Sequence, residues 1–148
     1  MPSLISTSEK ISLRASIKDV FDSFSREINI VLKPVQTIDI SSQFSSVYGR
    51  KINGNKTTQI PNETTVQSRV LYKNGTQELF DKAEASLKIV LPVGSVRLEI
   101  MAEDFATLKN AIMIKIDSIH YELVSGALPI DLFGEIHRYF FFAKPING

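Results

Sequence analysis

Hydrophobic residues recur at every second position over much of the chain, which is the period of a strand with one face against a core. The pattern returns along the chain at residues 28–32, 64–73, 87–91, 96–100, 112–116, 119–123 and 136–143. Turn residues separate these segments, as at Asn74-Gly75 and Asp117-Ser118. About seven or eight short strands at this spacing, without an internal repeat, predict a mostly-β fold, a small antiparallel β-barrel or sandwich.

Two of the predicted strands carry further information. Pro34 interrupts the first one and cannot donate a ladder hydrogen bond, so the strand is expected to bend there or to lie at an edge. The last strand is apolar on both faces, so either both faces are buried or one of them forms a contact surface.

Two short segments have helical spacing instead. The first follows Ser16, a candidate N-cap, and its apolar stripe consists of Ile17, Val20, Phe21 and Phe24. The second covers residues 102–110, and residues 77–85 fit either a helical turn or a loop. A helix as short as the first is not stable by propensity alone, so its phenylalanines require a partner surface in the same domain or on another subunit.

Two segments lack a clear period. Residues 1–13, which are rich in Ser and Thr, are expected to form an N-terminal arm that either frays or docks on a neighbour, and residues 14–148 a single β-barrel domain. Residues 41–61 are expected to form a long extended loop. We favour a solvated hairpin extension there over a basic finger that reaches a partner or DNA, because the finger rests on three basic residues alone, Arg50, Lys51 and Lys56.

Composition narrows the class of protein. The chain has 148 residues, about one domain, and 43% of them are hydrophobic, which is enough for a core. The net charge of +1 gives no reason to expect tight binding to a nucleic-acid backbone. Cysteine is absent, so disulfides play no part, and the polar N-terminus does not resemble a signal peptide. No apolar run approaches the roughly 20 residues that cross a bilayer, and we expect no membrane association.

Candidate catalytic chemistry is sparse in this sequence. The two histidines, His120 and His137, lie in predicted strands, where a surface or edge position is expected. Metal-binding His or Cys motifs, a phosphate-binding glycine loop and the nucleophile elbow of hydrolases are absent from the sequence. The sequence therefore predicts a protein that is not an enzyme, with no catalytic residue, metal or cofactor.

The order of several short segments resembles a known family. A helix and strand at residues 19–28 come first, followed by Val47-Tyr48-Gly49 and by the strand at residues 65–72. The later segments are a turn at 91–94, a helix at 103–109, a hairpin at 116–123, a loop at 132–134 and an aromatic final strand. Over residues 17–144 this order resembles the neck proteins of tailed bacteriophages, the head-closure, stopper or head-to-tail adaptor subunits that join the capsid portal to the tail.

The resemblance implies a structural virion protein, made in the host cytoplasm, that forms a sixfold or twelvefold ring in the neck. Such a ring would contact portal, adaptor and tail proteins, and DNA would pass through its lumen without sequence-specific binding. A tail terminator or tail-completion protein on a related barrel is the alternative, and a small-ligand-binding β-barrel is a weaker one. The residues expected to bind partners are Leu4, Ile5, Ile11, Phe21, Phe24, Tyr48, Arg50, Lys51 and Lys56.

Overall fold

The computed structural model describes residues 4–40, 44–45, 50–51, 55–74 and 78–146, and the side chains among them except those at positions 39–56 and 78–79. The elements in chain order are α1 (Thr7–Phe24), β1 (Arg26–Ile40), β2 (Phe44–Ser45), β3 (Arg50–Lys51), β4 (Asn55–Tyr72), α2 (Glu78–Leu87), β5 (Val96–Met101), the 3₁₀ turn η1 (Ala102–Asp104), α3 (Phe105–Lys109), β6 (Met113–Ile116), β7 (Ile119–Leu123), β8 (Leu128–Leu132) and β9 (Glu135–Pro145).

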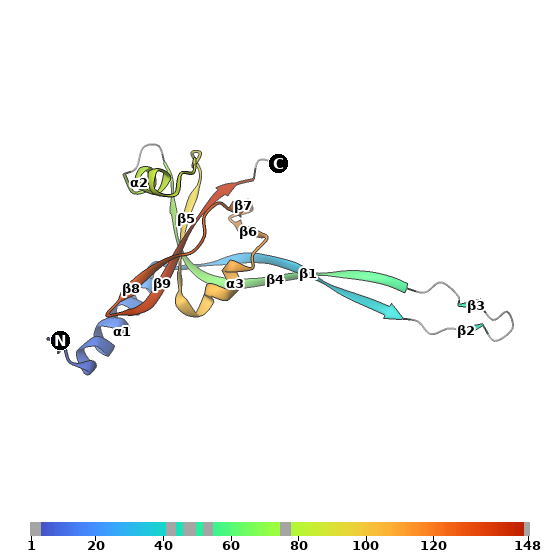
Figure 1. Ribbon diagram of the computed structural model, residues 1–148, viewed down its shortest axis with the longest axis horizontal. Coiled ribbons are helices and arrows are strands. Elements are labelled where there is room, and N and C mark those ends of the chain that lie inside the picture. Colours follow the sequence, from blue (N-terminus) through green and yellow to red (C-terminus); the bar gives the residue numbers. More distant parts are fainter. Residues whose placement is uncertain (1–3, 41–43, 46–49, 52–54, 75–77, 147–148) are drawn as a thin grey trace.

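The strands form an antiparallel barrel, which confirms the predicted class. A seven-stranded sheet runs in the order β5-β4-β1-β6-β7-β9-β8, and an additional pairing between β5 and β9 closes it (Figure 1). The long strand β9 makes this closure possible, because it pairs with β5 along one edge and with β8 and then β7 along the other. A second, two-stranded sheet joins β2 to β3.

The barrel interior is filled by the side chains that the two-residue period places on one face. Leu98 and Ile100 of β5, for example, have no exposed surface. Burial of each such side chain stabilises the fold by about 1.5–3 kcal/mol. The buried residues of this cluster are Ile28, Ile30, Val66, Val96, Leu98, Ile100, Leu108, Ile114, Ile116, Tyr121, Phe141 and Ala143.

The final strand is apolar on both faces because both faces are covered. Phe141 points into the barrel core, whereas Phe142 belongs to a second cluster on the outer face, with Phe80 of α2 and Leu91. The rings of Phe80 and Phe142 meet edge to face, with centroids 5.8 Å apart. The outer cluster is therefore where α2 packs against the barrel.

The strand predicted at residues 87–91 is wrong. Leu87 is the last residue of α2, and Lys88 has a positive φ of 54°, the left-handed conformation that commonly ends a helix. Ile89 and Leu91 lie in the loop that follows and pack into the outer cluster. Their alternation reflects contact with that cluster, not a place in the sheet.

The helix at the N-terminus starts much earlier than predicted, so the expected arm at residues 1–13 is wrong from residue 7 onward. Ser6 is the N-cap, and with Glu9 it forms a reciprocal capping box. The predicted cap, Ser16, lies inside the helix and donates a hydrogen bond to the carbonyl of Ser12. Several serines could cap this helix by their chemistry, and the glutamate three residues after Ser6 decides between them.

The loop predicted at residues 41–61 is also shorter than expected, because β4 begins at Asn55 and pairs with β1 as a long hairpin. Residues 55–61 thus belong to a hairpin extension of the kind that we favoured, and residues 41–43, 46–49 and 52–54 of the prediction lie outside the described residues. The register shifts between Leu32 and Val35, where Pro34 was predicted to bend the strand.

Two tight turns join the short strands. Asp117 and Ser118 both have positive φ between β6 and β7, as a two-residue hairpin turn requires, and this hairpin was predicted. Phe133 and Gly134 make an equivalent turn between β8 and β9. Strand β8 itself was not among the predicted strands.

Candidate assembly surface

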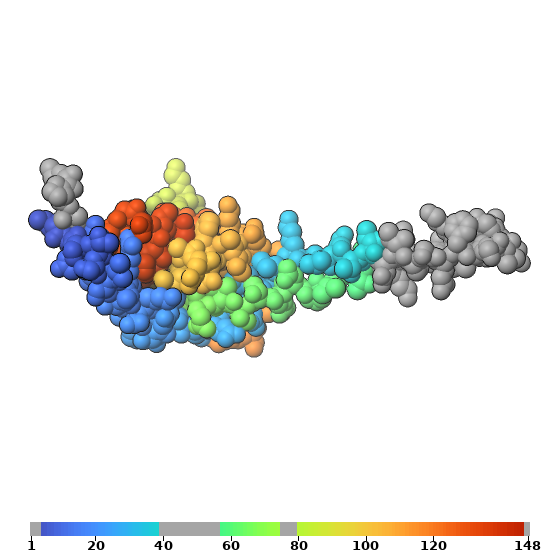
Figure 2. Space-filling model, turned by 90° about the horizontal axis from the view of Figure 1, so that it is seen from below, coloured from blue at the N-terminus to red at the C-terminus, as the bar shows by residue number. Residues whose placement is uncertain are grey.

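The hairpin of β1 and β4 extends beyond the barrel as a two-stranded arm (Figures 1 and 2). Inside the barrel, residues 29–31 of β1 pair with β6 as well as with β4. From Val35 onward, β4 is the only partner of β1 among the described residues, from Val35 opposite Ile60 to Ile40 opposite Asn55. We refer to residues 35–40 and 55–60 as the arm.

The arm has no core among its described side chains. Val35 and Ile60 lie directly opposite each other and are 53% and 49% exposed, and Ile38 on the other face is 61% exposed. An isolated two-stranded hairpin is only marginally stable in water, and its edges present unpaired backbone groups. The arm is therefore a surface that becomes more stable when a neighbour covers it.

Helix α1 lies at the opposite end of the molecule's long axis from the arm (Figure 1). Phe21 is its buried residue, at 2% exposed, whereas Ile11, Val20 and Phe24 are exposed. The phenylalanine stripe predicted from the sequence is thus split, with one ring packed inside the chain and the other, at Phe24, 67% exposed.

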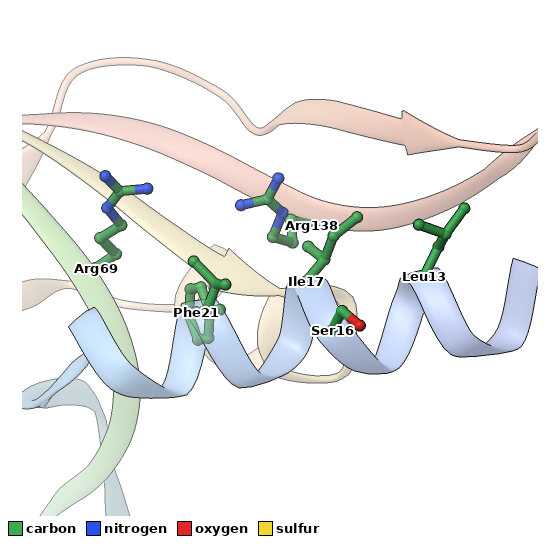
Figure 3. Close-up of a pocket in the computed structure, with 7 residues that line it drawn as sticks. Leu13, Ser16, Ile17, Phe21, Arg69 and Arg138 are labelled. Carbon is green, nitrogen blue, oxygen red and sulfur yellow. The ribbon is translucent and has the colours of Figure 1, made fainter.

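A groove of about 360 Å³ lies between α1 and the barrel (Figure 3). Its lining residues are Leu13, Ser16, Ile17, Val20 and Phe21 from α1, Arg69 from β4 and Arg138 from β9. The guanidinium groups of both arginines lie on the same side of α1 as Leu13 and Ile17 (Figure 3). The groove therefore combines an apolar wall with a cationic one.

The cationic wall belongs to a larger cluster on the outer face of three neighbouring strands. β5 pairs with both β4 and β9, and its Glu99 lies directly opposite Arg69, while Arg97 lies two residues further along β5. On β5 and β4, these positions alternate with core residues such as Leu98, so their side chains face outward.

The carboxylate of Glu99 lies among the three arginines and pairs with one of them. Glu99, whose side chain is 9% exposed, pairs with Arg138. Arg97 lies over the ring of Phe140, 4.4 Å from its centroid, and Arg69 lies 5.8 Å from the centroid of Phe24. Neither Arg69 nor Arg97 forms an ion pair with a described residue. Among the described residues the three arginines therefore share the single nearby carboxylate of Glu99, which forms its ion pair with Arg138 and also acts on the charge of Arg97.

The pKa of His137 lies below its ordinary value. Burial is the largest cause, and the charges of Arg138, Arg14 and Lys18 lower the pKa further. Cations from both β9 and α1 thus act on this imidazole of β9.

The structure separates the nine residues that were expected to bind partners. Leu4, Ile11 and Phe24 are exposed, Ile5 is half-buried, and Phe21 is buried within the chain. Tyr48 lies outside the described residues. Arg50 and Lys51 form β3 and Lys56 lies in β4, but their side chains are also outside the description.

Sequence reasoning missed the residues that form the groove's cationic wall. Arg69 stands between Ser68 and Val70, opposite the apolar face of its predicted strand, which is a signal that it lies on the outer face, whereas Arg138 lies in a strand predicted to be apolar on both faces and has no such signal. That signal does not say which strands become neighbours, so the gathering of both arginines against α1 follows from the pairing of β5 with β4 and with β9.

Two other kinds of feature are absent from the described ranges. Those residues contain no group of three or more His, Cys, Asp or Glu side chains placed to hold a metal ion. None of the helices described is long and apolar enough to span a membrane.

Comparisons with known proteins found no match for this chain among protein-family models, curated proteins or solved structures. The resemblance to phage neck proteins therefore rests on the order of sequence segments given above.

Proposed function

We propose that this protein is a structural subunit that works by assembly, as a neck protein of a tailed phage. It would form a sixfold or twelvefold ring that joins the capsid portal to the tail, with DNA passing through the lumen. The observation that carries the proposal is the arm, a two-stranded projection with exposed apolar residues such as Val35 and Ile60 and no third strand among the described residues.

The two ends of the molecule suit a head-to-tail contact. A ring closes when one patch on a subunit binds a different patch on the next one. The arm lies at one end of the long axis, and α1, with exposed Ile11 and Phe24, lies at the other (Figure 1). Two different apolar patches at opposite ends of a subunit meet this requirement.

The filled barrel favours assembly over small-ligand binding. Binding sites inside barrels require an interior cavity lined by a few convergent polar groups. Here the interior is occupied by apolar side chains such as Ile30, Leu98 and Ile114, all without exposed surface.

Removal of the arm tests the proposal. Leu32 and Asn62 face each other across the hairpin, so an Asn-Gly turn can replace residues 33–61 between them. We expect this variant to keep the fold of the barrel and to fail to join portal-containing or tail-containing particles seen by electron microscopy. A full-length protein that never joins such particles would refute the proposal.

A milder variant keeps the arm in place. Val35→Thr with Ile60→Thr removes the exposed apolar pair but retains strand propensity. Weaker incorporation into particles is expected, whereas Lys33→Gln, an exposed position beside the arm, should be incorporated normally.

The phenotype of a gene deletion separates the neck function from the alternative on a related barrel. Heads that lack tails, whether filled or leaking, indicate a neck protein. Tails of uncontrolled length indicate a tail terminator or tail-completion protein.

A further inference from the structure

We propose that the groove between α1 and the barrel binds an acidic, amphipathic peptide segment of an assembly partner, with its carboxylates on Arg69 and Arg138 and its apolar side chains against α1. The inference rests on the proposed function for the identity of the partner, but the binding itself is a property of the isolated chain.

The first argument is charge. Among the described residues, the three arginines on this face have one nearby carboxylate, Glu99, and it forms its ion pair with Arg138. Arg69 is exposed, lines the groove and forms no ion pair with a described residue. A carboxylate that enters the groove would reach Arg69 directly and would also be attracted by Arg138. Arginine pairs with carboxylates through two parallel hydrogen bonds, which gives such a contact both strength and direction.

The second argument is the preorganisation of the cationic wall. Arg138 is held by Glu99, and its side chain is 21% exposed. Arg69 lies 5.8 Å from the centroid of Phe24 on α1. Side chains that are already positioned lose less conformational freedom when a ligand binds.

The third argument is the apolar wall, which distinguishes a peptide from a nucleic acid. Leu13, Ile17 and Val20 line the groove opposite the arginines. Leu13 and Val20 are 44% and 55% exposed, so a covering segment would remove apolar surface from water. A phosphate backbone offers no apolar side chains for this wall, and a net charge of +1 does not favour a polyanion.

The test is a titration of the isolated protein with short synthetic peptides, followed by NMR shifts of backbone amides. One peptide carries leucine and glutamate at amphipathic spacing, and a matched peptide has glutamine in place of glutamate. We expect the acidic peptide to shift amides of α1, β4 and β9 and to bind more weakly as salt rises, and the glutamine peptide to bind at least several-fold more weakly.

Two variants assign the binding to the two walls. Arg69→Gln should weaken binding of the acidic peptide by roughly fivefold, the effect of about 1 kcal/mol for an exposed pair. Leu13→Ser removes apolar surface from the other wall without touching the core and should also weaken binding. Lys33→Gln, which removes an exposed positive charge next to the arm, should leave the affinity unchanged.

Three results would overturn the inference: no shift in the groove with the acidic peptide, equal binding of the glutamine peptide, or an unchanged affinity in Arg69→Gln. Binding of a short DNA duplex in the groove in preference to the peptide would overturn it as well. If the peptide does not bind but the protein still joins particles, only this inference is refuted. If the protein binds the peptide but never joins particles, only the proposed function is refuted.

Discussion

Helices α1 and α2 both lie outside the barrel core, at different places on the barrel (Figure 1), and they are held there by different contacts. Phe80 of α2 has no exposed surface and meets Phe142 edge to face. Each helix buries one of its described side chains, Phe80 in α2 and Phe21 in α1, but Ala83 and Leu87 of α2 also pack against the outer cluster, whereas a groove lies beside α1.

The ion pair that holds α2 is also more buried than the ion pairs of α1. The Lys73 ammonium, whose side chain is 10% exposed, donates to Glu84 of α2 and to the carbonyl of Leu91, each at 2.6 Å. The ion pairs of α1, such as Arg14 with Glu135, involve side chains that are more exposed, and such pairs contribute little to stability.

The comparison with α2 shows that a helix on this barrel need not leave its apolar residues exposed, as α1 does. Half-buried residues of α2 pack against the outer cluster, whereas a groove lies beside α1. Under the proposed function a neighbouring molecule would cover the open side of α1, and four predictions test the contrast between the two helices.

The largest effect is expected from Phe80→Ala. The ring is fully buried between α2 and β9, so its removal leaves a cavity and should lower the free energy of unfolding by about 4 kcal/mol. Chemical denaturation with urea measures this loss. A loss below about 1 kcal/mol would show that α2 is not tightly packed and would remove the contrast.

Phe21→Ala should follow, with a loss of about 3 kcal/mol in the same measurement. Its ring is as buried as that of Phe80 but borders the groove, where neighbouring side chains have space to move into the vacated volume. A negligible loss in the isolated protein would assign Phe21 to an interface between subunits.

Acid should weaken the attachment of α2. Hydrogen bonds from Lys73 and from the Leu91 amide lower the pKa of Glu84 below its ordinary value of 4.5. This stabilisation is present above pH 4.5 and is lost as the pH falls through the lowered pKa of the folded protein. Thermal midpoints measured across this range should fall less steeply for Glu84→Gln, which starts from a lower value at neutral pH.

A matched carboxylate provides the control for acid. Glu122 pairs with Lys144 on the surface, and both side chains are more than 40% exposed. Glu122→Gln should follow the pH profile of the wild-type protein. If the thermal midpoint depended equally weakly on pH in both variants, the ion pair of Glu84 would contribute no more to acid sensitivity than an exposed ion pair.

The smallest effect is expected from Phe24→Ala, the same chemical change on the open helix. Its ring is 67% exposed, so the free energy of unfolding of the isolated protein should change by less than about 0.5 kcal/mol. Incorporation into particles should nevertheless decrease. A stability loss as large as that of Phe80→Ala would show that Phe24 belongs to the folded domain and not to an interface.

The candidate site was only partly predictable. The apolar stripe of the first helix was found from its spacing, but spacing could not say that Phe21 turns inward and that Phe24 stays exposed. That division depends on which strand the helix meets. Arg69 and Arg138 are far apart in the sequence and come together only because β5 pairs with both of their strands.

The sequence by itself determined the features that depend on nearest neighbours and on a two-residue period. These are the β class, the inward-facing residues of strands such as β5, the hairpin at Asp117-Ser118 and the irregularity at Pro34. Each follows from local backbone geometry or from the need of alternate side chains to leave water, so no knowledge of distant segments is required.

Only the tertiary structure decided what covers the outer face of the barrel. Leu87, Ile89 and Leu91 alternate like the residues of a strand, yet they pack in the outer cluster with Phe80 and Phe142. An alternating pattern indicates that every second residue meets an apolar surface, but it does not distinguish a barrel core from another cluster. The groove and the arginine cluster also depend on the tertiary structure, because closure of the barrel brings their elements together. The arm depends on it as well, because closure of the barrel leaves this part of the hairpin without a further strand among the described residues.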